Sequence, residues 1–132
     1  MDRIYISGKI GETELSERTR RKFTGAQQLL ESMGYEVSNP ADEGWQAHLK
    51  KKYPTDCQHA YGHVDYYSYV LLRDQMELAT CDAICLLPDW RKSPGALAEL
   101  AFARATGKKV MELTSCGTIA EWKTEWKKIV MV

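Results

Sequence analysis

Residues 82–99 read DAICLLPDWRKSPGALAE, and this stretch decides the fold. Ala83–Leu87 is a short apolar run of the kind that forms a buried strand, and it ends at Pro88. Ser93 then precedes Pro94. This is a strong helix start, because the serine hydroxyl caps free backbone N–H groups and proline at the first helical position loses no hydrogen bond. The stretch therefore predicts a strand–helix unit, and open α/β sheets bind their ligands at the carboxyl ends of such strands.

The rest of the chain repeats this alternation of strand and helix. We expect strands at Arg3–Ser7, Tyr35–Ser38, Ala83–Leu87 and Lys109–Leu113. We expect helices at Ser16–Met33, Tyr66–Thr80, Gly95–Thr106 and from Thr118, where Glu121 completes a capping box. Alternating elements predict a single α/β domain over residues 1–132, doubly wound as in flavodoxin-like or Rossmann-like folds. Its parallel sheet is expected to have four to five strands, with helices on both faces.

Composition points to an ordinary soluble globular domain and excludes several partners. Of the 132 residues, 44% are hydrophobic, which is enough for a real core. The 18 Lys and Arg residues balance the 18 Asp and Glu residues, so no net field draws the protein to nucleic acid or membrane. Met1–Ile6 is too polar for a signal peptide, and no run is long enough to span a membrane. The four cysteines show no paired spacing; we expect Cys81 and Cys85 to be small buried thiols and the compartment to be a reducing cytoplasm.

A glycine-bearing loop, Ser7–Gly11, follows the first strand. Glycine lets backbone N–H groups approach an anion closely, and a following helix N-terminus carries a partial positive charge. Lys9 adds a full positive charge, which makes the loop a candidate phosphate or ribose site. The loop matches neither the dinucleotide fingerprint nor the P-loop, and a tight turn with a solvated lysine is the structural alternative.

Four carboxylates lie in or beside the central unit: Asp74, Asp82, Asp89 and Glu99. Cleavage of a glycosidic bond needs a carboxylate beside the anomeric carbon, because the transition state is a sugar cation. Glu99 lies in the second turn of its helix, whose N-terminus favours the ionised form that a nucleophile requires. Asp74 is suited to bind a sugar hydroxyl or to handle the proton of a departing base. The structural alternatives are a helix end for Asp82, a turn for Asp89 and a surface ion pair for Glu99.

Together these pieces resemble the nucleoside 2-deoxyribosyltransferase superfamily, which includes the 2′-deoxynucleoside 5′-monophosphate N-glycosidases. The resemblance is carried by five segments: Ile4–Ile10, Arg73–Asp74, Asp82–Leu87, Ser93–Glu99 and Ala101–Val110. Two signatures are most similar to a small bacterial and viral branch: Asn39–Ala41 and Leu86–Trp90. The similarity covers nearly the whole chain, apart from a variable insert at about 42–65.

The resemblance implies a double displacement at the anomeric carbon of a nucleoside or nucleotide, without a cofactor or a metal. Glu99 matches the nucleophile of the superfamily, and Tyr5 matches the tyrosine that orients it. Asp74 matches the aspartate that contacts the sugar or assists the leaving base. Substrate contacts are implied for Ser7, Gly8, Lys9, Ile10, Trp90, Ser93 and Gly95.

Position 93 separates the branches, since transferases that use free nucleosides carry aspartate there and monophosphate hydrolases carry serine. Ser93 therefore favours hydrolysis of a 5′-monophosphate with water as the acceptor. Lys9 departs from the hydrolases, which have a small hydroxyl residue there in their phosphate cradle. The alternatives are base exchange, the same chemistry on another ribosyl substrate, and a non-catalytic module that binds or sequesters a nucleotide. Proteins of this superfamily form homo-oligomers, so a homodimer or larger homo-oligomer is expected.

The segment 42–65 has no clear pattern and is expected to be a long loop. Cys57, His59 and His63 lie close in sequence, but their spacing is looser than that of zinc sites, which favours incidental histidines in a polar loop. Trp45 and the tyrosines in or next to the segment suit a lid that stacks on a base. The alternative is that Tyr66, Tyr69 and Val70 form the buried stripe of the next helix.

Overall fold

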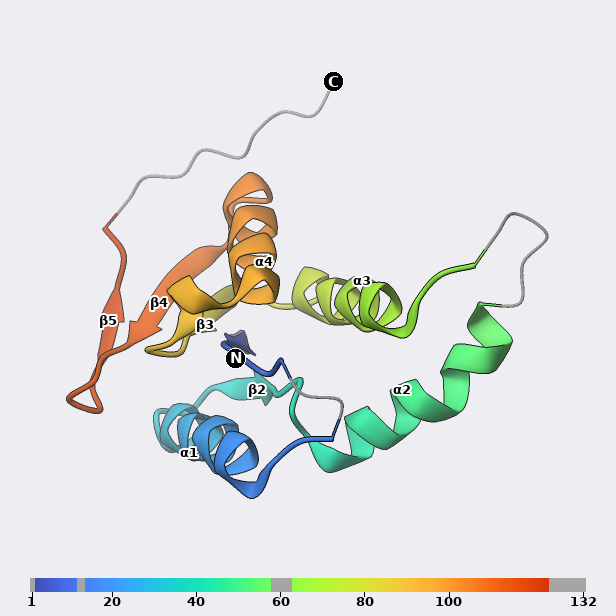
Figure 1. Cartoon of the computed structure of the whole chain (residues 1–132). Coiled ribbons are helices and arrows are strands. Elements are labelled where there is room, and N and C mark those ends of the chain that lie inside the picture. Colours follow the sequence, from blue (N-terminus) through green and yellow to red (C-terminus); the bar gives the residue numbers. More distant parts are fainter. Residues whose placement is uncertain (1, 12–13, 58–62, 124–132) are drawn as a thin grey trace.

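The computed structural model describes residues 2–11, 14–57 and 63–123, which form a layered α/β fold (Figure 1). The strands are β1 (Arg3–Ser7), β2 (Glu36–Ser38), β3 (Ala83–Leu86), β4 (Lys109–Leu113) and β5 (Ile119–Glu121). The helices are α1 (Glu17–Ser32), α2 (Glu43–Asp56), α3 (Tyr66–Ala79) and α4 (Pro94–Ala105), with a short 3-10 helix at Trp90–Lys92. The strands make one sheet in the order β2-β1-β3-β4-β5.

The sheet is mostly parallel, which confirms the predicted fold class. Strand β1 pairs in parallel with β2 and β3, and β3 pairs in parallel with β4. Strand β5 runs antiparallel to β4. The order 2-1-3-4-5 is that of flavodoxin-like sheets, which bind ligands beside the carboxyl ends of the strands where the winding reverses. In this chain that point lies between the ends of β1 and β3.

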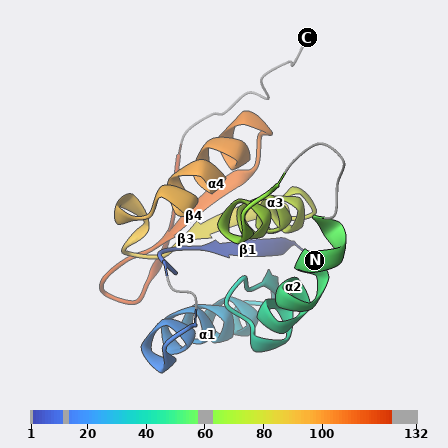
Figure 2. The ribbon, with the colours of Figure 1, turned by 45° about the vertical axis from the view of Figure 1, so that its right-hand side comes forward.

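Helices cover both faces of the sheet, as the alternation predicts. Figure 2 shows the sheet between α1 on one side and α3 and α4 on the other. The core on the α1 face includes Ile4, Ile6, Phe23, Leu30, Ala83 and Cys85. The core on the α3 and α4 face includes Tyr5, Leu78, Ile84, Leu86, Leu100 and Ala103. Because side chains alternate along a strand, Tyr5 and Ser7 of β1 both point to the face of α3 and α4.

The last helix does not begin where it was expected, and the part of that prediction beyond residue 123 lies outside the described residues. Thr118 does not begin a helix; the Thr114 N–H donates to its carbonyl at 2.8 Å in a turn that leads into β5. Gly117 adopts φ +83° in this turn, a conformation that favours glycine. The chain then pairs antiparallel with β4, so long-range strand pairing outweighs the local capping-box pattern between Thr118 and Glu121.

The segment 42–65 is not one long loop, because it contains the helix α2. Asp42 caps this helix, and its carboxylate accepts the Trp45 N–H at 3.1 Å. Trp45, Leu49 and Tyr53 recur every fourth residue, and Leu49 is fully buried. Pro54 lies inside the last turn of α2. Proline is normally a helix breaker, and only three large apolar residues mark the helix, which explains why the pattern was unclear.

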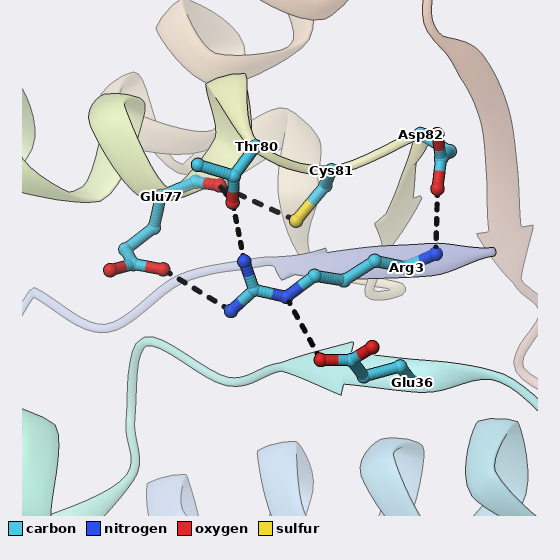
Figure 3. A network of polar contacts seen from close by, with 6 residues as sticks. All are labelled: Arg3, Glu36, Glu77, Thr80, Cys81 and Asp82. Atoms are coloured by element: carbon cyan, nitrogen blue, oxygen red, sulfur yellow. Dashed lines mark hydrogen bonds and ion pairs between the residues drawn. The ribbon is translucent and has the colours of Figure 1, made fainter. Parts of the chain in front are cut away.

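Arg3 ties the amino end of the sheet together (Figure 3). Its guanidinium donates to Thr80 Oγ1 and, at 3.3 Å, to Glu77, and Arg3 Nε lies 3.7 Å from Glu36. The Arg3 backbone N–H donates to the Asp82 carboxylate at 2.8 Å. Asp82 therefore connects β1 to the start of β3 at the end of the sheet opposite the carboxyl ends of the strands. It is a structural residue, as the alternative interpretation proposed.

The described part of the chain contains the two predicted buried thiols. Cys81 and Cys85 are free and buried, as expected. Burial raises the pKa of Cys85 to about 12, so this thiol stays protonated. Among the residues described, no helix is both long enough and apolar enough to cross a bilayer.

Candidate active site

A cavity of about 350 Å³ opens at the carboxyl end of β1. Its walls come from the loop after β1, from α2 and α3, and from the start of α4. The lining residues are Tyr5, Gly8, Ile10, Gly11, Pro40, Gln46, Tyr66, Tyr67, Val70, Leu71, Asp74, Ser93, Gly95, Ala96 and Glu99. The place where this topology binds ligands is therefore hollow and carries two carboxyl groups.

Glu99 of α4 is buried in the cavity wall, with 6% of its surface exposed. Tyr5 Oη donates to Glu99 Oε2 at 2.5 Å, and Ser7 Oγ donates to Oε1 at 2.8 Å. Both donors stand two residues apart on β1, so they reach the same face. Burial raises the pKa of Glu99 to about 7, although both hydrogen bonds lower it. The carboxyl group is thus fixed in one orientation and partly ionised at neutral pH.

Asp74 of α3 is the second buried acid of the cavity, also 6% exposed. Trp45 Nε1 donates to Asp74 Oδ1 at 2.8 Å. Burial and the negative charge of Glu99 raise the pKa of Asp74 to about 8, and the bond from Trp45 offsets this only in part. Asp74 therefore keeps its proton at neutral pH. One cavity offers both a proton donor and a carboxylate, the arrangement that acid-and-nucleophile chemistry needs.

The N-terminus of α4 does not decide the charge of Glu99. The helix position predicts a carboxylate that ionises more easily than usual, whereas the pKa of Glu99 is raised by burial. A helix N-terminus contributes about 0.3–1 kcal/mol to a nearby anion. Desolvation of a buried carboxylate costs several times more, so it outweighs the helix. The same burial excludes the surface ion pair considered as the alternative.

The loop after β1 enters the cavity through Gly8, Ile10 and Gly11. Gly8 packs closely, because a Cβ there would lie 2.8 Å from the side chain of Leu87. Lys9 is exposed and is not part of the lining, in contrast to its expected role at the phosphate. The helix α1 begins at Glu17 with Ser16 as its cap, as expected, so it does not follow Gly11 directly.

Lys22 and Asp89 hold this loop in place from outside the cavity, and we call these two residues the latch. The Lys9 backbone N–H donates to Asp89 Oδ1 at 3.0 Å, and Lys22 Nζ donates to the Lys9 carbonyl at 2.7 Å. Lys22 Nζ also lies 2.6 Å from Asp89 Oδ2. Burial alone would raise the pKa of Asp89, but the hydrogen bonds from Lys22 and Lys9 hold it below its usual value. Asp89 thus does more than end a turn: it fixes the loop that forms one wall.

Ser93 and Gly95 line the cavity as expected, and Trp90 does not. Ser93 Oγ accepts the Ala96 N–H at 3.1 Å, so the buried serine both caps α4 and faces the cavity. Trp90 is buried in the core, where its ring stands edge-on to Trp122 with the ring centroids 5.9 Å apart. The substrate contact expected of Trp90 is therefore not supplied by its ring in this structure.

Residues 2–112 match the family described as a domain of unknown function, DUF4406. The chain belongs to the DUF4406 family. No curated protein matches the chain. The matched range includes every residue that lines the cavity and ends within β4. The description of the DUF4406 family names no activity.

Aromatic residues of this DUF4406 chain divide between the cavity and the core. Tyr66 and Tyr67 line the cavity from the first turn of α3. Tyr69 is buried and packs edge-on against Tyr53, with centroids 5.4 Å apart. Tyr69 is therefore buried as the alternative predicted, whereas Tyr66 and Val70 line the cavity, and base stacking by the tyrosines stays a prediction. Sequence reasoning missed the contact of Trp45 with Asp74, because it predicted no helix at the tryptophan.

The cysteine and histidines near α2 do not form a metal site among the described residues. Cys57 follows α2 and His63 precedes α3, while His59 lies outside the described residues. Within residues 2–11, 14–57 and 63–123, no group of three His, Cys, Asp or Glu side chains is arranged to hold a metal ion.

Proposed function

We propose that this DUF4406 chain cleaves the N-glycosidic bond of a nucleoside 5′-monophosphate or a nucleoside, with Glu99 as the nucleophile and water as the acceptor. One observation carries the proposal: Glu99 and Asp74 are buried in one cavity and have separate hydrogen-bond partners. The resemblance to nucleoside 2-deoxyribosyltransferases supports it, because Tyr5, Ser93 and both acids stand at motif positions of that superfamily. The reaction needs neither a metal nor a cofactor.

In the first step, the Glu99 carboxylate attacks the anomeric carbon, and the C–N bond to the base breaks. Hydrogen bonds from Tyr5 and Ser7 hold the carboxylate in place before the attack. Asp74, which keeps its proton at neutral pH, gives that proton to the departing base nitrogen. The step leaves a glycosyl ester on Glu99, a free base and an Asp74 carboxylate.

In the second step, the roles reverse. The Asp74 carboxylate takes a proton from water, and the water oxygen attacks the anomeric carbon. A new C–O bond forms, and the ester bond to Glu99 breaks with its electron pair returning to the carboxylate. Asp74 is protonated again, so both residues end in their starting states.

The cavity has two sides that suit the two ends of a nucleotide. Tyr66, Tyr67, Val70 and Leu71 form an apolar and aromatic side on α3, which suits a planar base. We assign a 5′-phosphate to the Gly8–Gly11 loop and to the N-terminus of α4, where backbone N–H groups favour an anion.

Homo-oligomer formation is also part of the proposal. Leu72, Met76 and Leu97 are large apolar side chains on α3 and α4 that are 57%, 64% and 45% exposed. Contact with a second copy of the chain would remove this apolar surface from water. Light scattering of wild type and Met76→Glu tests this: the wild type is expected above the monomer mass and the variant closer to it. A monomeric wild type would contradict the assembly.

Chromatographic release of free base tests the reaction. The panel comprises ribo- and deoxynucleosides and their 5′-monophosphates, with and without a second base. We expect release without a second base, and no release by Glu99→Gln, which keeps the size of the side chain. Release that requires a second base would make the protein a transferase. Binding without release from any panel member would support the non-catalytic alternative.

A further inference from the structure

Trp45 stands behind Asp74, on a helix that the sequence pattern did not reveal. We propose that Trp45 is a positioning residue for Asp74: its indole N–H holds Oδ1 and thereby places the carboxylic proton on Oδ2. The bond is 2.8 Å long and joins α2 to α3 across 29 residues of sequence. The inference rests on the proposed function in one respect: the proton on Oδ2 is the one that Asp74 is proposed to give to the departing base.

The chemistry of the indole group favours one position of the proton. An indole N–H is a donor and never an acceptor. The carbonyl oxygen of a carboxylic acid is a better acceptor than its hydroxyl oxygen, whose hydrogen occupies one of the bonding directions. The bond from Trp45 therefore favours Oδ1 as the unprotonated oxygen and Oδ2 as the oxygen that carries the proton of the acid. A carboxyl group without such a donor can carry its proton on either oxygen.

The indole ring is itself held in place by two side chains. His48, one turn further along α2, stacks on Trp45 with centroids 5.6 Å apart and an angle of 23° between the planes. The guanidinium of Arg73 lies 5.5 Å from the Trp45 ring centroid. Arg73 also bonds to Asp56 near the end of α2 at 3.0 Å. The ring therefore cannot turn away from Asp74 without losing its contacts with His48 and Arg73.

The groups around Asp74 shift its pKa in opposite directions, and Trp45 does so without carrying a charge. Burial raises the pKa of Asp74 most, and repulsion from Glu99 of α4 and Glu77 of α3 raises it further. Attraction to Arg73 lowers it. Tyr5 of β1 lies close enough for Asp74 to raise its pKa in turn. Trp45 contributes a hydrogen bond that favours the carboxylate without adding a charge. It thus keeps the acid able to release its proton in a site that disfavours ionisation.

A substitution that removes the N–H but retains an aromatic ring tests the proposal. Trp45→Phe is titrated beside wild type by NMR of protein labelled with 13C at aspartate carboxyl carbons. The matched control is Trp90→Phe, which removes an indole N–H bonded to Glu112 at 3.4 Å, outside the cavity lining. A benzothienylalanine at position 45, which keeps the bicyclic shape and lacks the N–H, separates the hydrogen bond from packing.

We expect the pKa of Asp74 to be higher by about one unit in Trp45→Phe and in the benzothienylalanine protein, and unchanged in the control. Base release from substrates that need a protonated leaving group should fall about tenfold in kcat, with little change in KM. Release of nitrophenolate from a nitrophenyl 2-deoxyriboside, which leaves without protonation, should stay within about twofold. An unchanged Asp74 titration in the benzothienylalanine protein would overturn the proposal. A raised pKa without any base release would sustain the role of Trp45 and refute the proposed reaction instead.

Discussion

Asp74 makes the folded protein sensitive to alkaline pH. Its pKa is about 8 in the folded state, against 3.8 for an ordinary aspartate. Between these values the folded protein holds a proton that the unfolded chain has released, so the free energy of unfolding falls as pH rises through the window. At about 1.4 kcal/mol per pKa unit, the full loss is on the order of 6 kcal/mol, a large part of the stability of a small domain.

Asp74→Asn should remove this dependence. The amide has nearly the same shape, its oxygen still accepts the Trp45 N–H, and it does not ionise. We expect the variant to exceed wild type by about 1–2 kcal/mol at pH 5, and this excess to grow by at least about 2 kcal/mol between pH 5 and pH 9. The lower bound allows for relaxation and water entry, which reduce the cost of burying a charge.

Urea denaturation at pH 5, 7 and 9, followed by circular dichroism, measures the effect. Glu31→Gln, on the exposed side of α1, is the matched control, because it removes one carboxylate without touching the cavity. Its stability should follow that of wild type at every pH. If Asp74→Asn also follows wild type in parallel from pH 5 to pH 9, Asp74 is not a buried acid with a raised pKa, and its assignment as the proton donor fails.

Three further substitutions test other parts of the site. Gly8→Ala puts a Cβ 2.8 Å from Leu87 and should cost about 1–3 kcal/mol in denaturation experiments; a cost below about 0.5 kcal/mol would contradict the close packing. Lys22→Met breaks the ion pair with Asp89, whose two side chains are about 30% exposed. Because such a pair is partly solvated, we expect a loss of less than about 1 kcal/mol in the free energy of unfolding, but faster hydrogen exchange at the loop amides. Tyr5→Phe removes a donor that favours the Glu99 carboxylate, so the acid limb of the pH–rate profile should move to higher pH; an unmoved limb would refute this role.

The fold could be predicted well because local patterns and topology agree. Ser16 and Ser93 cap the helices they were expected to begin, and Gly34 follows the end of α1 with φ +92°. The exceptions are elements whose local signal is weak or misleading. Strand β5 depends on pairing with β4, and α2 has few apolar residues to reveal its buried side.

Most of the candidate residues could be placed from the sequence, but Lys9 and Trp90 could not, and neither could the chemistry of the site. Glu99, Asp74 and Tyr5 stand in recognisable motifs, and all three line the cavity. Their pKa values depend on burial, which a position in the sequence does not reveal. The donor from Trp45 and the latch of Lys22 depend on contacts across 29 and 67 residues, which no local pattern encodes.

The most direct test of the central claim is whether Glu99 becomes covalently glycosylated. Wild type is mixed with a 2-deoxy-2-fluoroarabinosyl nucleoside, whose fluorine destabilises the sugar cation and slows hydrolysis of the ester. The protein is then quenched in acid, digested and analysed by mass spectrometry. If Glu99 is the nucleophile, we expect one sugar attached to the peptide that contains Glu99, and no adduct in Glu99→Gln. Base release by wild type with a sugar on another residue, or with no covalent adduct at all, would contradict it.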